Sequence, residues 1–242
     1  MTALMNLSDG EDAPAADRST LVTNAYRALR RDIIDGKLRP GSKLRVEHLK
    51  DDYNVGASTL REALALLASD ALVTSQGQRG FRVAPITISD FYDITETRIL
   101  LETNAIKQSM RRGGDEWEGA LTAAFHILGL AEQRLDDTKP ETLNAWEIAN
   151  KRFHHALIGE CESPWTLHFL AILFNQAERY RRLLLSNRPV TRNVHDEHRA
   201  IYEAAMSGDE AVLSEVLAKH IRYNYLLLEK LSPQAIAHAG AE

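Results

Sequence analysis

Apolar residues fall three or four positions apart in three stretches near the start of the chain, which is the spacing of one face of an α-helix. The stretches cover residues 20–34, 46–53 and 58–68. Glycine-containing turns separate them, at residues 35–36 and 54–56. The pattern therefore predicts three consecutive short helices.

The period then changes to that of β-strands. Residues 72–74 and 81–83 are short runs of β-forming residues, and the polar segment 75–80 between them contains two glycines. Two such runs around a glycine-containing turn predict a β-hairpin. Three helices followed by a two-stranded wing form a winged helix-turn-helix, in which residues 58–68 would be the recognition helix.

Beyond residue 89 only helical patterns recur. They predict six helices, at residues 89–111, 115–136, 140–160, 164–186, 191–206 and 209–231. The loops between them are short, so neighbouring helices are expected to pack antiparallel in an all-α bundle. Aromatic residues such as Trp165 and Phe169 fall on the apolar stripes and are expected in its core.

These patterns predict a mainly α protein with two domains. Residues 1–17 are polar and aperiodic and are expected to be a disordered tail. The winged helix-turn-helix would cover residues 18–84 and a linker residues 85–88. An all-helical domain would cover residues 89–232, and residues 233–242 would form a flexible tail.

Composition narrows the class of protein. Of 242 residues, 44% are hydrophobic and 26% are charged, which is typical of a globular chain and excludes collagen or wholesale disorder. The single cysteine, Cys161, excludes an internal disulfide and a multi-cysteine zinc site. No apolar run approaches the ~20 residues of a membrane span, and the first residues lack a secretory signal pattern. We expect a cytoplasmic protein without a membrane partner.

Charge is segregated along the chain. The net charge is −5, yet residues 18–84 carry twelve Lys and Arg against seven Asp and Glu. The remaining segments are acidic. A basic module on an acidic body is typical of a protein in which one part meets a polyanion. Chance scatter is the alternative on charge alone.

Arginines and small polar residues mark candidate DNA contacts in the basic module. A recognition helix offers its N-terminal residues to base edges, the residue that opens the preceding helix can reach phosphate, and an arginine at the wing tip suits a narrow minor groove. The candidates are Arg45, Ala57, Ser58, Thr59, Arg61, Gln78, Arg79 and Gly80. Each arginine alone could be a solvated surface charge, but their joint placement on one small module predicts a nucleic-acid partner.

Histidines mark a candidate metal site in the helical region. His154 lies four residues after Asn150, so both share one helix face, and His220 follows His198 by 22 residues. Three imidazoles and one oxygen ligand on three helices could bind a divalent cation such as Zn²⁺. Surface or core histidines are the alternative, and His155 and His195 compete on spacing.

Several segments of the basic module resemble the GntR family of bacterial transcription regulators. They are the turn at residues 37–44, residues 53–55, the helix residues 60–64 and the wing residues 79–83. The resemblance implies a transcription regulator that binds double-stranded operator DNA as a homodimer. This chain has Gly56-Ala57 where the family often has Ser-Arg, so a base-contacting arginine of many relatives is missing.

Residues 89–232 resemble the FCD class of effector-binding domains, which implies that this domain binds effector and metal and carries the dimer contacts. The matching pieces are residues 97–102, 150–154, 197–198, 208–209 and 219–220. In that class an Asp and three His commonly hold a metal, which implies Asn150, His154, His198 and His220 as ligands here, with Zn²⁺ as the expected ion. Asn150 stands where the class has Asp, and the neutral amide should lower metal affinity.

Arg98 matches the arginine that faces the effector in that class. A guanidinium beside a metal suits a small carboxylate, because it forms two parallel hydrogen bonds. The alternative is an ordinary ion pair with Glu102, four residues further along the helix. The chain is also similar to carbon-starvation-induced regulators of γ-aminobutyrate and glutarate breakdown, which implies a small dicarboxylate or an amino-acid-derived acid.

The sequence thus predicts an effector-responsive DNA-binding regulator, a repressor released by a carboxylate. Two alternatives remain open. One is a helical metal-dependent hydrolase, although the chain lacks the His-Glu-x-x-His, Gly-x-Ser-x-Gly and phosphate-loop motifs. The other is an architectural DNA-binding protein that does not switch. We expect no enzymatic activity.

Overall fold

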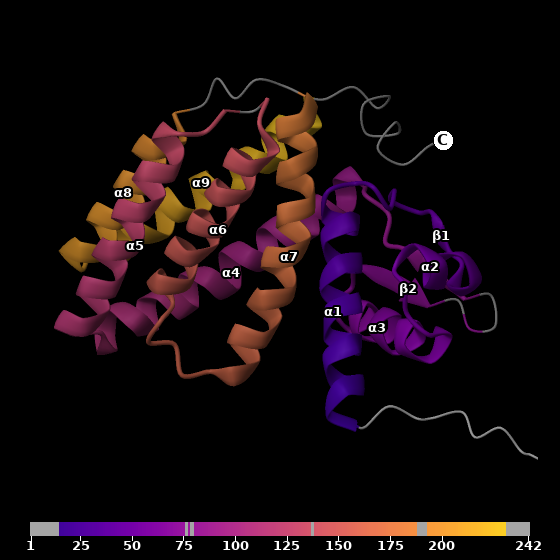
Figure 1. Cartoon of the computed structure of the whole chain (residues 1–242). Coiled ribbons are helices and arrows are strands. Elements are labelled where there is room, and N and C mark those ends of the chain that lie inside the picture. Colours follow the sequence, from indigo (N-terminus) through magenta and orange to yellow (C-terminus); the bar gives the residue numbers. More distant parts are fainter. Residues whose placement is uncertain (1–14, 76, 78–79, 137, 188–192, 231–242) are drawn as a thin grey trace, which may run out of the picture.

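The computed structural model describes residues 15–75, 77, 80–136, 138–187 and 193–230. Figure 1 shows two units, a small winged helix-turn-helix domain and a larger helical bundle. In the described ranges, no helix combines the length and the apolar composition needed to cross a membrane.

The small domain contains three helices and a three-stranded sheet. Its elements are α1 (Ala15–Ile34), β1 (Lys43–Leu44), α2 (Val46–Asp52), α3 (Ala57–Ser69), β2 (Val73–Ser75) and β3 (Phe81–Val83). The sheet is antiparallel in the order β1-β3-β2. The sequence predicts the β2–β3 hairpin but not β1, because a two-residue strand is too short to show a period. Helix α1 starts at Ala15, inside the segment expected to be a disordered tail.

Leucines from α1 and α3 form the core of this domain. Leu29, Leu60, Leu64 and Leu67 are all fully buried. Burying each such side chain contributes about 1.5–3 kcal/mol relative to exposure. This core fixes the angle at which α3 presents its outer face.

The bundle consists of six helices with short connections. They are α4 (Ile88–Arg112), α5 (Asp115–Gln133), α6 (Pro140–Leu157), α7 (Pro164–Asn187), α8 (Val194–Ser207) and α9 (Glu210–Glu229). Their bounds lie within three residues of the sequence prediction. Local caps explain several ends: the Thr87 hydroxyl accepts from the Asp90 amide, Pro140 opens α6, and Gly208 with φ of +75° closes α8.

Phe153 lies fully buried at the centre of the bundle, packed with leucines from several helices. Two aromatic residues expected in this core lie outside it. Trp165 is 70% exposed and Phe169 is 49% exposed, and their rings stack near the start of α7. The helical pattern of the sequence does not show which apolar stripe of a helix is covered by the rest of the bundle.

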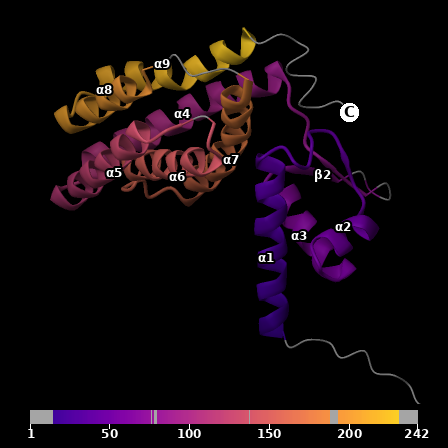
Figure 2. The ribbon, with the colours of Figure 1, turned by 45° about the horizontal axis from the view of Figure 1, so that its top comes forward.

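Helix α7 joins the two units. It lies beside α1 in both views of the chain (Figures 1 and 2). The buried Arg179 donates to the backbone oxygen of Ala84 at 2.6 Å, and Gln176 donates to that of Asp70 at 3.0 Å. The Tyr180 ring stacks on Phe91 near the linker. These contacts hold the small domain against one helix of the bundle.

Candidate functional site

The recognition helix α3 turns one polar face outward. Ser58 and Arg61 are exposed, and Ala57 is half-buried. Thr59 is only 6% exposed, so its side chain has little surface to offer to DNA, and its base contact stays a prediction. Residues 58 and 61 are nearly one turn apart and share a face, whereas residue 59 is rotated toward the core.

Two other predicted contacts also lie at the surface of the small domain. Arg45 is exposed at the residue before α2, and Gly80 adopts φ of +86° where β3 begins. That left-handed conformation favours glycine. Gln78 and Arg79, at the predicted wing tip, lie outside the described residues. The contact roles of all these residues stay predictions.

Three predicted metal ligands come together in the bundle. His154 on α6, His198 on α8 and His220 on α9 are all buried. Their candidate ligating atoms lie within 4.8 Å of one another. The ring centroids are 4.7 Å apart for His198 and His220, and 5.5 Å apart for His154 and His220. Nothing in local spacing requires this convergence across three helices.

A carboxylate from another position faces the Nδ1 atom of each ring. The distances are 2.6 Å from His198 to Glu132, 2.9 Å from His220 to Glu197 and 3.3 Å from His154 to Glu102. An ionised carboxylate only accepts, so the hydrogen-bonded Nδ1 atoms of His198 and His220 carry the proton and their Nε2 atoms are the ones that can bind a metal. His154 Nδ1 lies near Glu102 without a hydrogen bond to it. The sequence patterns do not reveal these three glutamates as supports of the cluster.

The donor set fits a divalent metal such as Zn²⁺. Burial lowers the pKa of His154 to about 4, more than the Glu102 carboxylate raises it, so the imidazole is neutral near pH 7. Metal ligands must be deprotonated in this way. Three buried imidazoles, each with a carboxylate facing Nδ1, are a donor set typical of zinc.

His155 and His195 lie outside this cluster. His195 binds the second oxygen of Glu132 at 2.7 Å and stacks on Phe125, so it supports Glu132 from the other side. His155 is exposed beside Phe174. The arrangement separates the two competitors from the candidate ligands.

Arg98 lies buried next to the cluster. Its Nε atom donates to Glu102 at 2.7 Å, and its guanidinium carbon lies 5.0 Å from the centre of the Phe174 ring. The ion pair considered as an alternative is therefore present. Arg98 also lines a cavity, so its predicted effector role remains a prediction alongside that pair.

This cavity, called the central cavity below, is lined by the predicted effector residue Arg98 and by Asn150 and His154, two of the four predicted metal ligands. Its lining consists of Arg98, Glu147, Asn150, Lys151, His154, Phe174, Glu178 and Arg181. The buried Asn150 shares it with His154, one helical turn away. The volume is only about 10 Å³, roughly the room for one water molecule. The central cavity is closed around its own ion pairs in this conformation.

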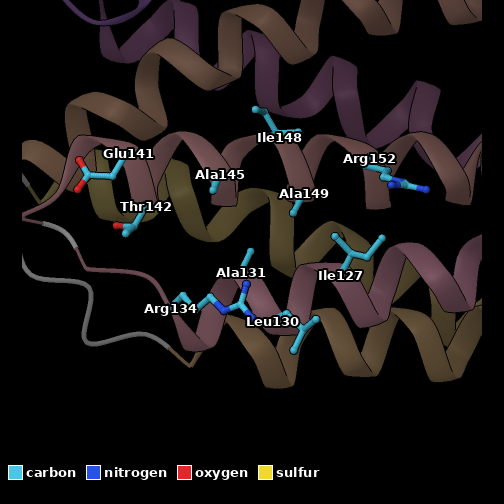
Figure 3. Close-up of a pocket in the computed structure, with 10 residues that line it drawn as sticks. All are labelled: Ile127, Leu130, Ala131, Arg134, Glu141, Thr142, Ala145, Ile148, Ala149 and Arg152. Atoms are coloured by element: carbon cyan, nitrogen blue, oxygen red, sulfur yellow. The ribbon is translucent and has the colours of Figure 1, made fainter.

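A larger groove of about 360 Å³ lies between α5 and α6 (Figure 3). Ile127 and Ile148 contribute apolar surface, with Arg134 and Arg152 at its sides. It contains none of the predicted site residues. The convergent polar groups, which give a ligand site its specificity, are in the central cavity.

The two units together define a class of protein. A winged helix-turn-helix joined to a helical bundle is the architecture of a DNA-binding regulator. The family comparisons agree: the model of the gntR family of bacterial regulatory proteins matches residues 21–83, and the FCD domain model matches residues 93–223. The chain belongs to the GntR family, with an FCD domain, and is a transcription regulator, not an enzyme.

Similar proteins carry the same architecture. The chain is 43% identical over 217 residues to the uncharacterized HTH-type transcriptional regulator BphR of Paraburkholderia xenovorans (strain LB400), covering 89% of this chain and 88% of BphR. It is 34% identical to the HTH-type transcriptional repressor GlaR of Escherichia coli (strain K12), covering 82% and 91%. A solved GntR regulator from Rhodococcus sp. RHA1 shares the fold, with a TM-score of 0.69 at 20% identity over 88% of this chain and 100% of that one.

Proposed function

We propose that this regulator is a repressor whose affinity for operator DNA falls when a small carboxylate binds in the central cavity. The convergence of three buried histidines beside Arg98 carries the proposal. The likeness to GlaR, which is named as a repressor, supports the sign of regulation. Coupling between two such sites is typically ~1–3 kcal/mol.

In this proposal His154, His198 and His220 hold a divalent metal together with the amide oxygen of Asn150. Zn²⁺ is the expected ion. The bound metal would supply positive charge for a carboxylate oxygen of the effector. Arg98 would orient that carboxylate by paired hydrogen bonds while keeping its contact with Glu102. Asn150 brings no charge, so the site would bind metal less tightly than one with Asp.

On the DNA side, a homodimer would bind a two-fold symmetric operator in the cytoplasm. Ser58 and Arg61 would meet base edges in the major groove, and Arg45 would meet phosphate. Ala57 would pack close to the bases. Gln78, Arg79 and Gly80 would form the wing tip.

Operator binding under effector control tests this function. A high-affinity duplex is first selected from random double-stranded DNA. Its binding is then measured by fluorescence anisotropy at fixed salt, with and without Zn²⁺ and a series of carboxylates. His198→Ala should keep basal DNA binding and lose the carboxylate response, whereas His126→Ala, an exposed histidine on α5, should behave as wild type.

The outcomes separate the alternatives. Specific binding that some carboxylate weakens in a zinc-dependent way supports the proposal. Specific binding that no metal or carboxylate changes would favour an architectural protein, and absence of sequence preference would contradict an operator-binding role.

A further inference from the structure

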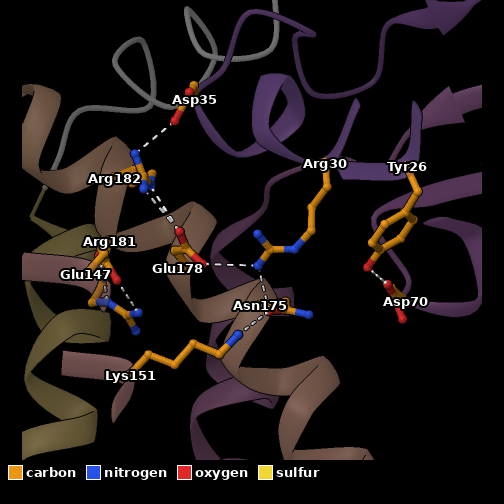
Figure 4. Close-up of polar contacts among 10 residues, drawn as sticks. All are labelled: Tyr26, Arg30, Asp35, Asp70, Glu147, Lys151, Asn175, Glu178, Arg181 and Arg182. Atoms are coloured by element: carbon orange, nitrogen blue, oxygen red, sulfur yellow. Dashed lines mark hydrogen bonds and ion pairs between the residues drawn. The ribbon is translucent and has the colours of Figure 1, made fainter. Parts of the chain in front are cut away.

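One amide oxygen of α7 contacts both the central cavity and the DNA-binding domain. Asn175 Oδ1 accepts from the Arg30 guanidinium on α1 at 2.7 Å and from the Lys151 ammonium on α6 at 3.2 Å. Figure 4 shows the two cations reaching Asn175 from opposite sides. Arg30 belongs to the winged helix-turn-helix, and Lys151 lines the central cavity. The shared oxygen therefore links the two units.

Lys151 differs from the other cations that line the cavity, because its hydrogen-bond partner is a neutral side chain. Arg98 is paired with Glu102 at 2.7 Å, and Arg181 is paired with Glu147 at 2.8 Å. Among the described residues, no carboxylate oxygen lies within 4.0 Å of the Lys151 ammonium, which donates only to the neutral Asn175. Lys151 is thus the lining cation whose charge a bound anion can compensate without first breaking an ion pair.

The cavity cannot take up an organic acid without moving its lining. Its volume of about 10 Å³ is far below the size of an organic acid. The lining residue Glu178 contacts the small domain directly, because its carboxylate accepts from Arg30 at 3.3 Å. Glu178 also binds Arg182 at 3.2 Å, which in turn binds Asp35 after α1 at 2.8 Å.

We propose that Lys151 binds an acidic group of the effector and that its exchange of Asn175 for that group shifts α1 against α7. The Lys151–Asn175–Arg30 relay is then the route by which occupancy of the cavity reaches the recognition helix. This inference rests on the proposed function, since it names the effector contact and the transmission at the same site. A ligand shifts such an equilibrium only through contacts that differ between the two states, and the relay provides one.

Two variants separate binding from transmission. Lys151→Met keeps the apolar stem and removes the charge, and Asn175→Leu keeps the approximate volume and removes the shared acceptor. Arg152→Met is the matched control, because Arg152 is the next residue on α6, is exposed and lines the α5–α6 groove instead. Lys151→Arg retains the charge if the Met variant does not fold.

The probes are acetate, benzoate and glutarate, titrated by calorimetry into zinc-loaded full-length protein, and then into its complex with a selected operator. Lys151→Met should weaken binding of the tightest probe about tenfold or more, which is the size expected for loss of a hydrogen bond to a charged group. Lys151→Arg should recover most of it. Asn175→Leu should bind the probe within about threefold of wild type, keep basal operator affinity and lose most of the probe-induced release.

Equal probe affinity in wild type and in a folded Lys151→Met protein would overturn the inference. Full probe-induced release of operator DNA by Asn175→Leu, or absence of binding by every probe, would overturn it as well. The anion titrations use no DNA. A chain that binds the probes through Lys151 but selects no operator would therefore contradict the proposed function and leave the Lys151 contact standing.

Discussion

Glu132→Gln tests whether the carboxylates behind the histidines tune the predicted metal site. Glu132 accepts from His198 at 2.6 Å and from His195 at 2.7 Å, one ring on each oxygen. Burial raises the pKa of Glu132, but His198 and His195 outweigh it and hold the pKa below its usual value, so the group is ionised at pH 7. Glutamine keeps the shape, loses the charge and offers one acceptor for two rings.

The expected effect follows from that geometry. Removing a carboxylate behind a metal-bound histidine typically lowers metal affinity 10–100-fold, about 1.4–2.7 kcal/mol. We expect this loss for Zn²⁺, measured by competition with a chelator of known affinity at pH 7. Glu118→Gln, an exposed glutamate on the same helix, should bind as wild type. Affinity within twofold of wild type in a folded Glu132→Gln protein would refute the assigned role of Glu132.

Three further predictions use other residues. Arg61→Ala should abolish operator preference while the bundle stays folded, since one paired base contact discriminates by ~1–3 kcal/mol; affinity within twofold of wild type in a gel shift would contradict it. Asn150→Asp should tighten zinc binding in the same competition assay, because a carboxylate adds charge to similar oxygen geometry; unchanged or weaker binding would argue against Asn150 as a ligand. In chelator-treated protein the folded His154 has a pKa of about 4, whereas its unfolded pKa is about 6.5. The unfolded state therefore takes up the proton first, and the free energy of unfolding should fall by about 3 kcal/mol from pH 6.5 to 4. His154→Gln should lose less stability over this range. Equal losses of unfolding free energy in wild type and His154→Gln, measured by urea titration, would contradict the burial argument.

Helical periodicity predicted the bundle closely because each helix buries one stripe along most of its length. Caps such as Pro140 and Gly208 then fixed the ends. The two-residue β1 strand carried no such signal, since its pairing with β3 depends on the tertiary fold. The burial of Thr59 follows from rotation along α3: successive residues turn by about 100° around a helix axis, so neighbours at the start of the helix do not share one surface.

The candidate site shows the same division between local and tertiary information. Asn150 and His154 are one turn apart on α6, so their shared face follows from spacing. The support of His198 by Glu132 depends on how α5 crosses α8, and no interval in the sequence encodes that crossing. The Arg30–Asn175 contact joins residues 145 positions apart in two domains, so only the folded chain reveals it.

The proposed function depends on a metal centre at the three buried histidines. Diffraction from crystals of zinc-loaded protein, measured above and below the zinc absorption edge, locates the ion. We expect one anomalous peak per chain, at about 2.0–2.1 Å from the Nε2 atoms of His154, His198 and His220. A zinc-saturated protein with no peak among these rings, or with its peak at other residues, would contradict it.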